Sequence, residues 1–162
     1  SLAILDVTAG NTILYGSIGL ALGDMLSGLL SQILQSRRKA VGISLIAAAS
    51  LTVIYLSTHE KNADYIYMLC FFLGLAAGYW AVLVTMAAEQ FGTNIRGTVA
   101  TTIPNFVRGS AVLTVSAFSH LKNIMLVPSA ALCVGGVIFI LAGIALKCLG
   151  ETFSRDLDYI ET

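Results

Sequence analysis

Charged residues are scarce in this sequence, and their scarcity limits the classes of protein that it can form. Only 11% of the 162 residues are charged, whereas 57% are hydrophobic and the mean hydropathy is +0.86. Soluble domains carry roughly 25% charged residues. A water-soluble fold of this length could not bury so much apolar surface. We therefore expect an integral membrane protein whose first partner is the lipid bilayer.

Cysteine is also sparse, and the usual catalytic motifs are missing. The three cysteines lie inside apolar runs without metal-ligand spacing, so neither a disulfide framework nor a metal site is predicted. Motifs of serine hydrolases, zinc proteases and nucleotide-binding enzymes do not occur. The net charge of zero gives no argument for a nucleic-acid partner, and none is predicted. The sequence thus predicts neither an enzyme nor a cofactor.

Long apolar runs are what the sequence has in place of charge. Crossing a bilayer takes about 20 mostly apolar residues. Five segments meet or nearly meet that length, covering residues 11–35, 40–57, 64–86, 97–118 and 127–149. Their continuous hydrophobicity favours helices over barrel strands, in which apolar residues alternate with polar ones. The sequence predicts an all-α polytopic transmembrane helix bundle with about five spans, antiparallel between short connectors.

Basic residues predict the orientation of this bundle. Six of them lie in alternate connectors and the tail: Arg37, Arg38, Lys39, Arg96, Lys147 and Arg155. The opposite side carries only Lys61 and Lys122. The positive-inside rule places the larger group, and the tail at 150–162, on the cytoplasmic side. The expected location is the cell (inner) membrane. Residues 1–10 are then an external segment, and we expect further chain before them.

Two ionisable side chains interrupt the expected spans. Asp24 lies 12 positions before Ser36, and Arg108 lies 12 positions after Arg96. At 1.5 Å per residue both are about 18 Å from the same membrane face, so we expect them to pair directly, through water or through substrate. Two interpretations stay open: an ion pair that fixes helix packing, or a substrate or proton site in a transport pathway.

Polar and aromatic residues near the same depth extend this candidate pathway. Asn105 shares a helix face with Arg108 and follows Pro104, which is expected to kink the helix. Tyr79 and Trp80 lie well inside the third expected span rather than at its ends. Ordinary packing remains the alternative for each of these side chains.

Small residues form two stripes at helical spacing. Gly19, Gly23 and Ser27 repeat every four residues in the first expected span, as do Gly74 and Gly78 in the third. Small residues allow helix backbones to approach closely in a membrane. We expect these stripes to pack within one bundle rather than to dimerise.

Two connectors and the tail resemble motifs of the major facilitator superfamily of transporters. Residues 28–39 are similar to the loop G-x-x-x-D-R-x-x-x-R-R. Residues 89–97 resemble E-x-F-P-T-x-x-R-G of the sugar-porter and metabolite–proton symporter branches. Residues 151–161 resemble the ending P-E-T-x-G-R-x-L-x-x-I-E of the same branches. All three lie, in the family's order, on the expected cytoplasmic side.

This resemblance implies a function and a set of gate residues. The chain would supply the last five helices of a twelve-helix transporter, with the preceding half as its partner. Such proteins move a small polar solute by alternating access, and coupling to protons is left open. Gln32 stands where the family has an acidic residue, which alters its charge cluster. The cytoplasmic gate would involve Gln32, Arg37, Arg38, Glu89 and Arg96.

Two other functions remain open from the sequence. A membrane sensor or assembly protein could retain the fold without transport, and the altered position at Gln32 favours it. The ionisable Asp24 and Arg108 oppose it, because intramembrane charges are costly to keep without use. An oligomeric channel is the third alternative, although no ring-forming pore motif occurs.

Overall fold

The computed structural model describes residues 7–57 and 62–154, and every regular element in these ranges is an α-helix. The expected all-α class is confirmed. The helices are α1 (Ala9–Ile33), α2 (Arg37–Ser57), α3 (Ala63–Ala77), α4 (Trp80–Ala88), α5 (Thr93–Leu121) and α6 (Val127–Cys148). The external segment expected over 1–10 falls partly, and the tail over 150–162 mostly, outside the described residues.

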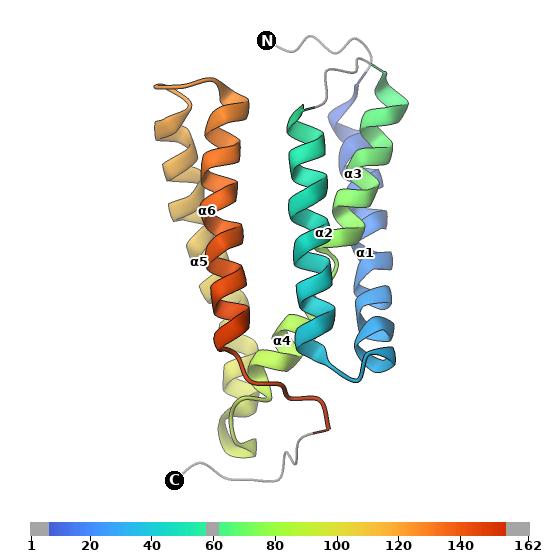
Figure 1. The fold of residues 1–162 in the computed structure, drawn as a ribbon, viewed down its shortest axis with the longest axis vertical. Coiled ribbons are helices and arrows are strands. Elements are labelled where there is room, and N and C mark those ends of the chain that lie inside the picture. Colours follow the sequence, from blue (N-terminus) through green and yellow to red (C-terminus); the bar gives the residue numbers. More distant parts are fainter. Residues whose placement is uncertain (1–6, 58–61, 155–162) are drawn as a thin grey trace.

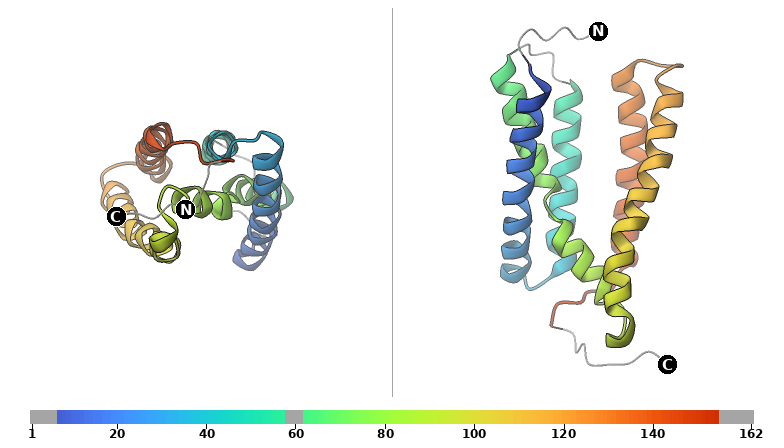
Figure 2. Two further views of the ribbon diagram at one scale, coloured as in Figure 1. Left: turned by 90° about the horizontal axis from the view of Figure 1, so that it is seen from below. Right: turned by 180° about the vertical axis from the view of Figure 1, so that it is seen from behind.

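The helices form two groups that meet at one end of the bundle. Figure 1 shows α1, α2 and α3 side by side, and α5 beside α6 as a separate antiparallel pair. The short helix α4 runs obliquely from the first group to the second, as the view from behind in Figure 2 makes clear. This end also holds the connectors α1–α2 and α4–α5, and with them four of the basic residues expected in the cytoplasm: Arg37, Arg38, Lys39 and Arg96. We call it the basic end.

Four of the five expected spans are long and apolar enough to cross a membrane. They are Ala9–Ile33, Arg37–Ser57, Ala63–Ala88 across α3 and α4, and Val127–Cys148. The remaining segment, 97–118, lies within α5, whose 29 residues extend over about 43 Å. α5 is therefore long enough to cross a membrane, but it is too polar to count among the four candidate spans. Its passage through the bilayer stays a prediction.

The third expected span is interrupted near its middle. α3 ends at Ala77, Gly78 and Tyr79 leave the helix, and α4 begins at Trp80. The backbone of Gly78 lies against α1: a Cβ added there would be 2.6 Å from the backbone nitrogen of Asp24. Only glycine fits such a close approach. The interruption turns α4 away from α3 and toward α5.

Glycine also brings α1 and α3 together over their length. Gly19 and Gly23 are buried. A Cβ on Gly19 would overlap the Phe71 carbonyl oxygen, and one on Gly74 would lie 3.0 Å from the Leu20 nitrogen. The small-residue stripes therefore pack inside one bundle, as expected.

The described apolar core is small and lies toward the basic end. Val41, Val82 and Met86 form it, and Leu146 from α6 packs against them. Large apolar side chains elsewhere are mostly exposed, and α5 has no buried residue. Exposed apolar helix faces are what a lipid solvent requires.

A tight turn after α1 positions the first residues of α2. Gln35 adopts a left-handed backbone with φ 48°, the Gln35 N–H donates to the Gln32 carbonyl, and the Ser36 N–H donates to the Ser31 carbonyl. These two bonds form a Schellman motif. Ser36 then accepts a hydrogen bond from the Lys39 N–H at 3.1 Å and caps α2. Arg37 is therefore held at the start of α2, facing the other connectors.

Candidate functional site

An ion pair links two connectors at the basic end. The Arg37 Nη2 atom lies 2.6 Å from Glu89 Oε1, and the side chains are only 22% and 7% exposed. Arg37 opens α2, whereas Glu89 caps the end of α4. Such a charge-assisted bond away from water is stronger than an exposed surface pair. Two predicted gate residues are thus brought into direct contact.

This ion pair uses only part of the available hydrogen-bonding capacity. Glu89 Oε2 and Arg37 Nε are both buried and have no hydrogen-bond partner in the described part of the chain. Arginine and carboxylate can form two parallel bonds, but here the bond is single. The remaining donor and acceptor are available to another group in a different arrangement of the connectors.

The segment after α6 adds a second carboxylate to this site. Glu151 Oε1 accepts hydrogen bonds from the backbone N–H groups of Arg37 at 3.0 Å, Thr152 at 3.0 Å and Phe153 at 3.1 Å. Its Oε2 atom accepts from the Ser36 hydroxyl. Glu151 therefore lies at the N-terminus of α2, where the helix dipole favours an anion. We name Arg37, Glu89 and Glu151 the basic-end network.

Glu151 was not among the sequence-predicted site residues. Its only sequence signal is its position in the tail segment that resembles the family ending. Gln90 strengthens the same junction, because its Nε2 atom donates to the Gly150 carbonyl at 2.8 Å. The start of α2, the end of α4 and the segment after α6 are consequently held together.

The charge of Glu151 makes this junction sensitive to acid. Partial burial acts to raise the pKa of Glu151, but the hydrogen bonds from Ser36, Phe153, Arg37 and Thr152 outweigh it and lower the pKa below its ordinary value. A depressed carboxyl pKa stabilises the fold above the unfolded value and loses that stabilisation as the pH falls through the folded value. We expect Glu151→Gln to lower the melting temperature at about pH 7 and to lower it less at about pH 3, below the ordinary carboxyl range. Thermal unfolding in detergent at both pH values measures this, and an equal difference at both would contradict it.

The other predicted gate residues take different positions. Gln32 is exposed in the last turn of α1, and Arg38 is half-buried on α2. Arg96, in the first turn of α5, donates from Nη2 to the Phe91 carbonyl at 3.2 Å. The structure therefore brings together Arg37 and Glu89 and distributes the remaining three around them.

Asp24 lies at the helix interruption in the middle of the bundle. Its Oδ1 atom accepts a hydrogen bond from the Ala81 N–H at 3.2 Å, in the first turn of α4. The first N–H groups of a helix have no partner within that helix. Inside a membrane such groups are costly to leave unsatisfied. Asp24 thus caps α4 from the neighbouring helix α1.

Asp24 and Arg108 are not in direct contact. In the described ranges the ion pair is Arg37–Glu89, and Arg108 is exposed on α5. The expected direct pairing is absent from this structure, because equal depth along two helices does not make their side chains face each other. Asn105 is also exposed and donates weakly to the Thr101 carbonyl at 3.5 Å. α5 continues through Pro104 without a break.

The two predicted aromatic residues separate at the same interruption. Tyr79 is half-buried and packs against the core of Val82 and Met86. Trp80 is the first residue of α4 and is 38% exposed. The structure therefore gives Tyr79 a packing position and leaves Trp80 accessible.

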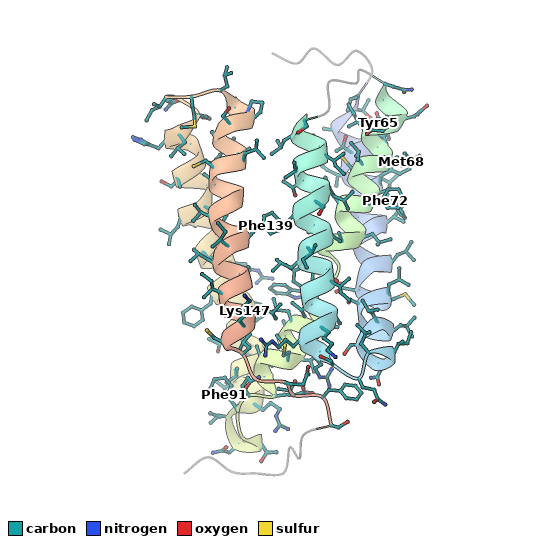
Figure 3. The ribbon with its side chains drawn as sticks, viewed as in Figure 1. Tyr65, Met68, Phe72, Phe91, Phe139 and Lys147 are labelled. Atoms are coloured by element: carbon teal, nitrogen blue, oxygen red, sulfur yellow. The ribbon has the colours of Figure 1, made fainter. Side chains whose placement is uncertain are left out.

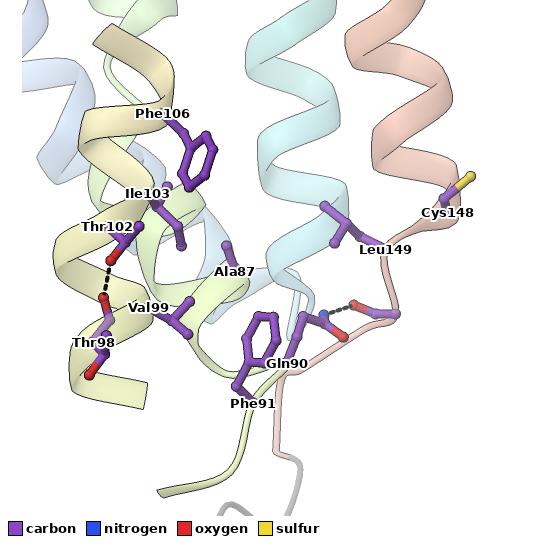
Figure 4. A pocket seen from close by; sticks show the side chains of 11 residues that line it. Ala87, Gln90, Phe91, Thr98, Val99, Thr102, Ile103, Phe106, Cys148 and Leu149 are labelled. Carbon is purple, nitrogen blue, oxygen red and sulfur yellow. Dashed lines mark hydrogen bonds between the residues drawn. The ribbon is translucent and has the colours of Figure 1, made fainter. Parts of the chain in front are cut away.

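A pocket of about 610 Å³ lies where α4, α5 and α6 meet at the basic end. Figure 4 shows Phe91, Ile103 and Leu149 directed into it. Its Thr102 hydroxyl donates to the Thr98 carbonyl at 2.7 Å and is therefore engaged by its own helix. An apolar pocket with few available polar groups does not match a site for a polar solute.

Neither a metal centre nor a known relative helps to define the site. The described residues include no group of three or more histidine, cysteine, aspartate or glutamate side chains that could hold a metal ion. No family model, curated protein or solved structure matches the chain. The candidate site therefore consists of the basic-end network and the interruption at Asp24.

Proposed function

We propose that this chain forms part of a secondary active transporter that moves a small polar solute by alternating access, as its resemblance to the major facilitator superfamily implies. The Arg37–Glu89 ion pair is the observation that carries the proposal. It joins the two connectors whose sequences resemble the family's gate motifs. An ion pair made in only one conformation shifts the balance between conformations.

Three features fit a gate better than a static brace. The pair is mostly shielded from water, its second donor and acceptor are unused, and Glu151 lies on the same helix start. Opening the basic end would separate α2 from α4 and break these contacts together. The unpaired Arg37 Nε and Glu89 Oε2 atoms could then form hydrogen bonds with other groups in the second conformation.

The interrupted helix and α5 support a polar pathway. Transporter helices are often discontinuous beside the substrate site, where irregular backbone lines a cavity. Thr98, Thr101, Asn105 and Arg108 recur at three- and four-residue steps on α5, so they share one face. Polar and charged groups at such depth normally face water or protein rather than lipid. We propose that this face borders the solute path, with a preceding helix half opposite.

Neutralising Glu89 tests the gate directly. The reporter is a cysteine replacing Asn105, in the full protein with Cys70, Cys133 and Cys148 changed to serine. A membrane-impermeant maleimide is applied from either side of oriented vesicles. Loss of a charge-assisted bond worth about 1.5–3 kcal/mol predicts that Glu89→Gln raises labelling from the basic side at least about tenfold.

Controls separate gating from general loosening. Asp64→Asn removes an acid in the first turn of α3, away from the basic-end network, and is expected to leave labelling unchanged. An unchanged ratio in Glu89→Gln would contradict the gate. Solute-dependent labelling without any flux in proteoliposomes would instead support the sensor alternative.

A further inference from the structure

A second groove lies at the basic end, between α2 and α6, outside the proposed solute path. It has a volume of about 700 Å³ and carries three cationic side chains at its polar end, from Arg38, Lys39 and Lys147. Lys147 is labelled in Figure 3 near the lower end of α6. We call this second groove the α2–α6 groove.

The three cations form no ion pair with the described residues. The ion pair found there is Arg37–Glu89, which does not involve them. Glu151 is the acid in the groove lining, and its oxygens already accept bonds from Ser36 and from backbone N–H groups. An excess of positive charge therefore remains at this end of the groove.

The rest of the groove is apolar and extends toward the middle of the bundle. Leu45, Ile46 and Leu146 line it together with Gly42 and Gly143. From Arg38 to Ile46 the helix rises about 12 Å, within the hydrocarbon half-layer of about 15 Å. A Cβ added to Gly143 would meet nothing within 4 Å, so glycine keeps the groove open there.

We propose that the α2–α6 groove binds one anionic phospholipid. Its phosphate would lie on Arg38, Lys39 and Lys147, and one acyl chain would follow the apolar part of the groove. Charge complementarity selects an anionic headgroup, and the continuous apolar wall selects an attached chain over a free anion. Basic pockets between transmembrane helices have the chemistry to bind such headgroups. The bound lipid would bridge α2 and α6, and so join the two helix groups.

Native mass spectrometry of the purified full protein tests this proposal. Phosphatidylglycerol is expected to remain bound, whereas phosphatidylcholine, which has no net charge, is not. The double variant Lys39→Gln/Lys147→Gln is expected to bind phosphatidylglycerol about 25-fold more weakly, at about fivefold for each charge. Lys122→Gln, at the opposite end of the bundle, is the matched control and is expected to bind as the unaltered protein does.

A second pair of variants tests the position of the acyl chain. Gly143→Leu fills the groove and is expected to weaken phosphatidylglycerol binding at least about tenfold. Gly28→Leu places the same side chain in open space on α1 and is expected to bind normally. Equal binding of both lipids, or no loss in the lysine variant, would overturn the proposal. Displacement by an equal concentration of glycerol phosphate, or unchanged binding in Gly143→Leu, would overturn the acyl-chain placement.

Discussion

Replacing Gly23 with valine is expected to force α1 and α3 apart and to destabilise the whole bundle. A Cβ at Gly23 would overlap the Leu75 carbonyl oxygen and lie 3.0 Å from the Gly78 Cα. These atoms belong to backbone, so no side-chain rotation relieves the clash. Overpacking typically costs about 1–3 kcal/mol, and a clash with backbone atoms is expected at the upper end of that range. The two helices would have to separate along their shared glycine stripe.

Gly28→Val is the matched control for this prediction. It makes the same substitution five positions further along α1, where an added Cβ meets nothing within 4 Å. Fluorescence-detected gel filtration during heating in detergent measures the result. We expect Gly23→Val to aggregate at a far lower temperature than Gly28→Val. Equal melting temperatures would show that α1 and α3 do not depend on this contact.

Asp24→Ala is expected to produce the second large effect, at the interruption between α3 and α4. It removes the acceptor for the Ala81 N–H, an exposed donor within the candidate membrane span Ala63–Ala88. A backbone donor left without a partner away from water costs about 1–3 kcal/mol. The melting temperature in detergent should fall accordingly, and proteolysis between α3 and α4 should become faster.

Asp24→Asn distinguishes this capping role from proton transfer. Asparagine keeps a side-chain oxygen that accepts from Ala81, but it cannot carry a negative charge. Stability close to that of the unaltered protein is therefore expected. If Asp24 also carries protons during transport, proton-driven solute uptake should be lost in the same variant. Uptake equal to that of the unaltered protein would reduce Asp24 to a structural cap.

Arg108→Lys completes the test of the intramembrane charges. Arg108 is exposed on α5 and makes no ion pair with any described residue, so its replacement should not alter stability. A loss of solute uptake in Arg108→Lys would thus identify a role in the pathway. Retained uptake in both Asp24→Asn and Arg108→Lys would remove these residues from the proposed mechanism.

Hydrophobic runs made the helices predictable, but only in part. The spans at 40–57 and 127–149 correspond closely to α2 and α6, because apolar composition and flanking polar residues are local properties. The segment at 97–118 formed a helix but carries too many polar residues to rank with the four apolar spans. Its polar side chains bond largely to their own backbone, as Thr102 does to Thr98.

The interruption at Gly78 was not predictable from local sequence. After Asp64, residues 65–86 are predominantly apolar and contain no proline. The break depends on the approach of Gly23 and Asp24 from another helix, which hydropathy does not describe. The small-residue stripes did predict that α1 and α3 would pack closely, although not that one stripe would end the helix.

The sequence by itself determined the helical class, the membrane environment and the gathering of basic residues at one end, because each follows from composition and spacing along the chain. Only the tertiary structure decided which charges meet. Asp24 and Arg108 were expected at the same depth, but Asp24 accepts a hydrogen bond from α4 and Arg108 is exposed on α5. Arg37, Glu89 and Glu151 are far apart in sequence and converge because three chain segments end at the same place. Such convergence depends on helix packing, which no local pattern records.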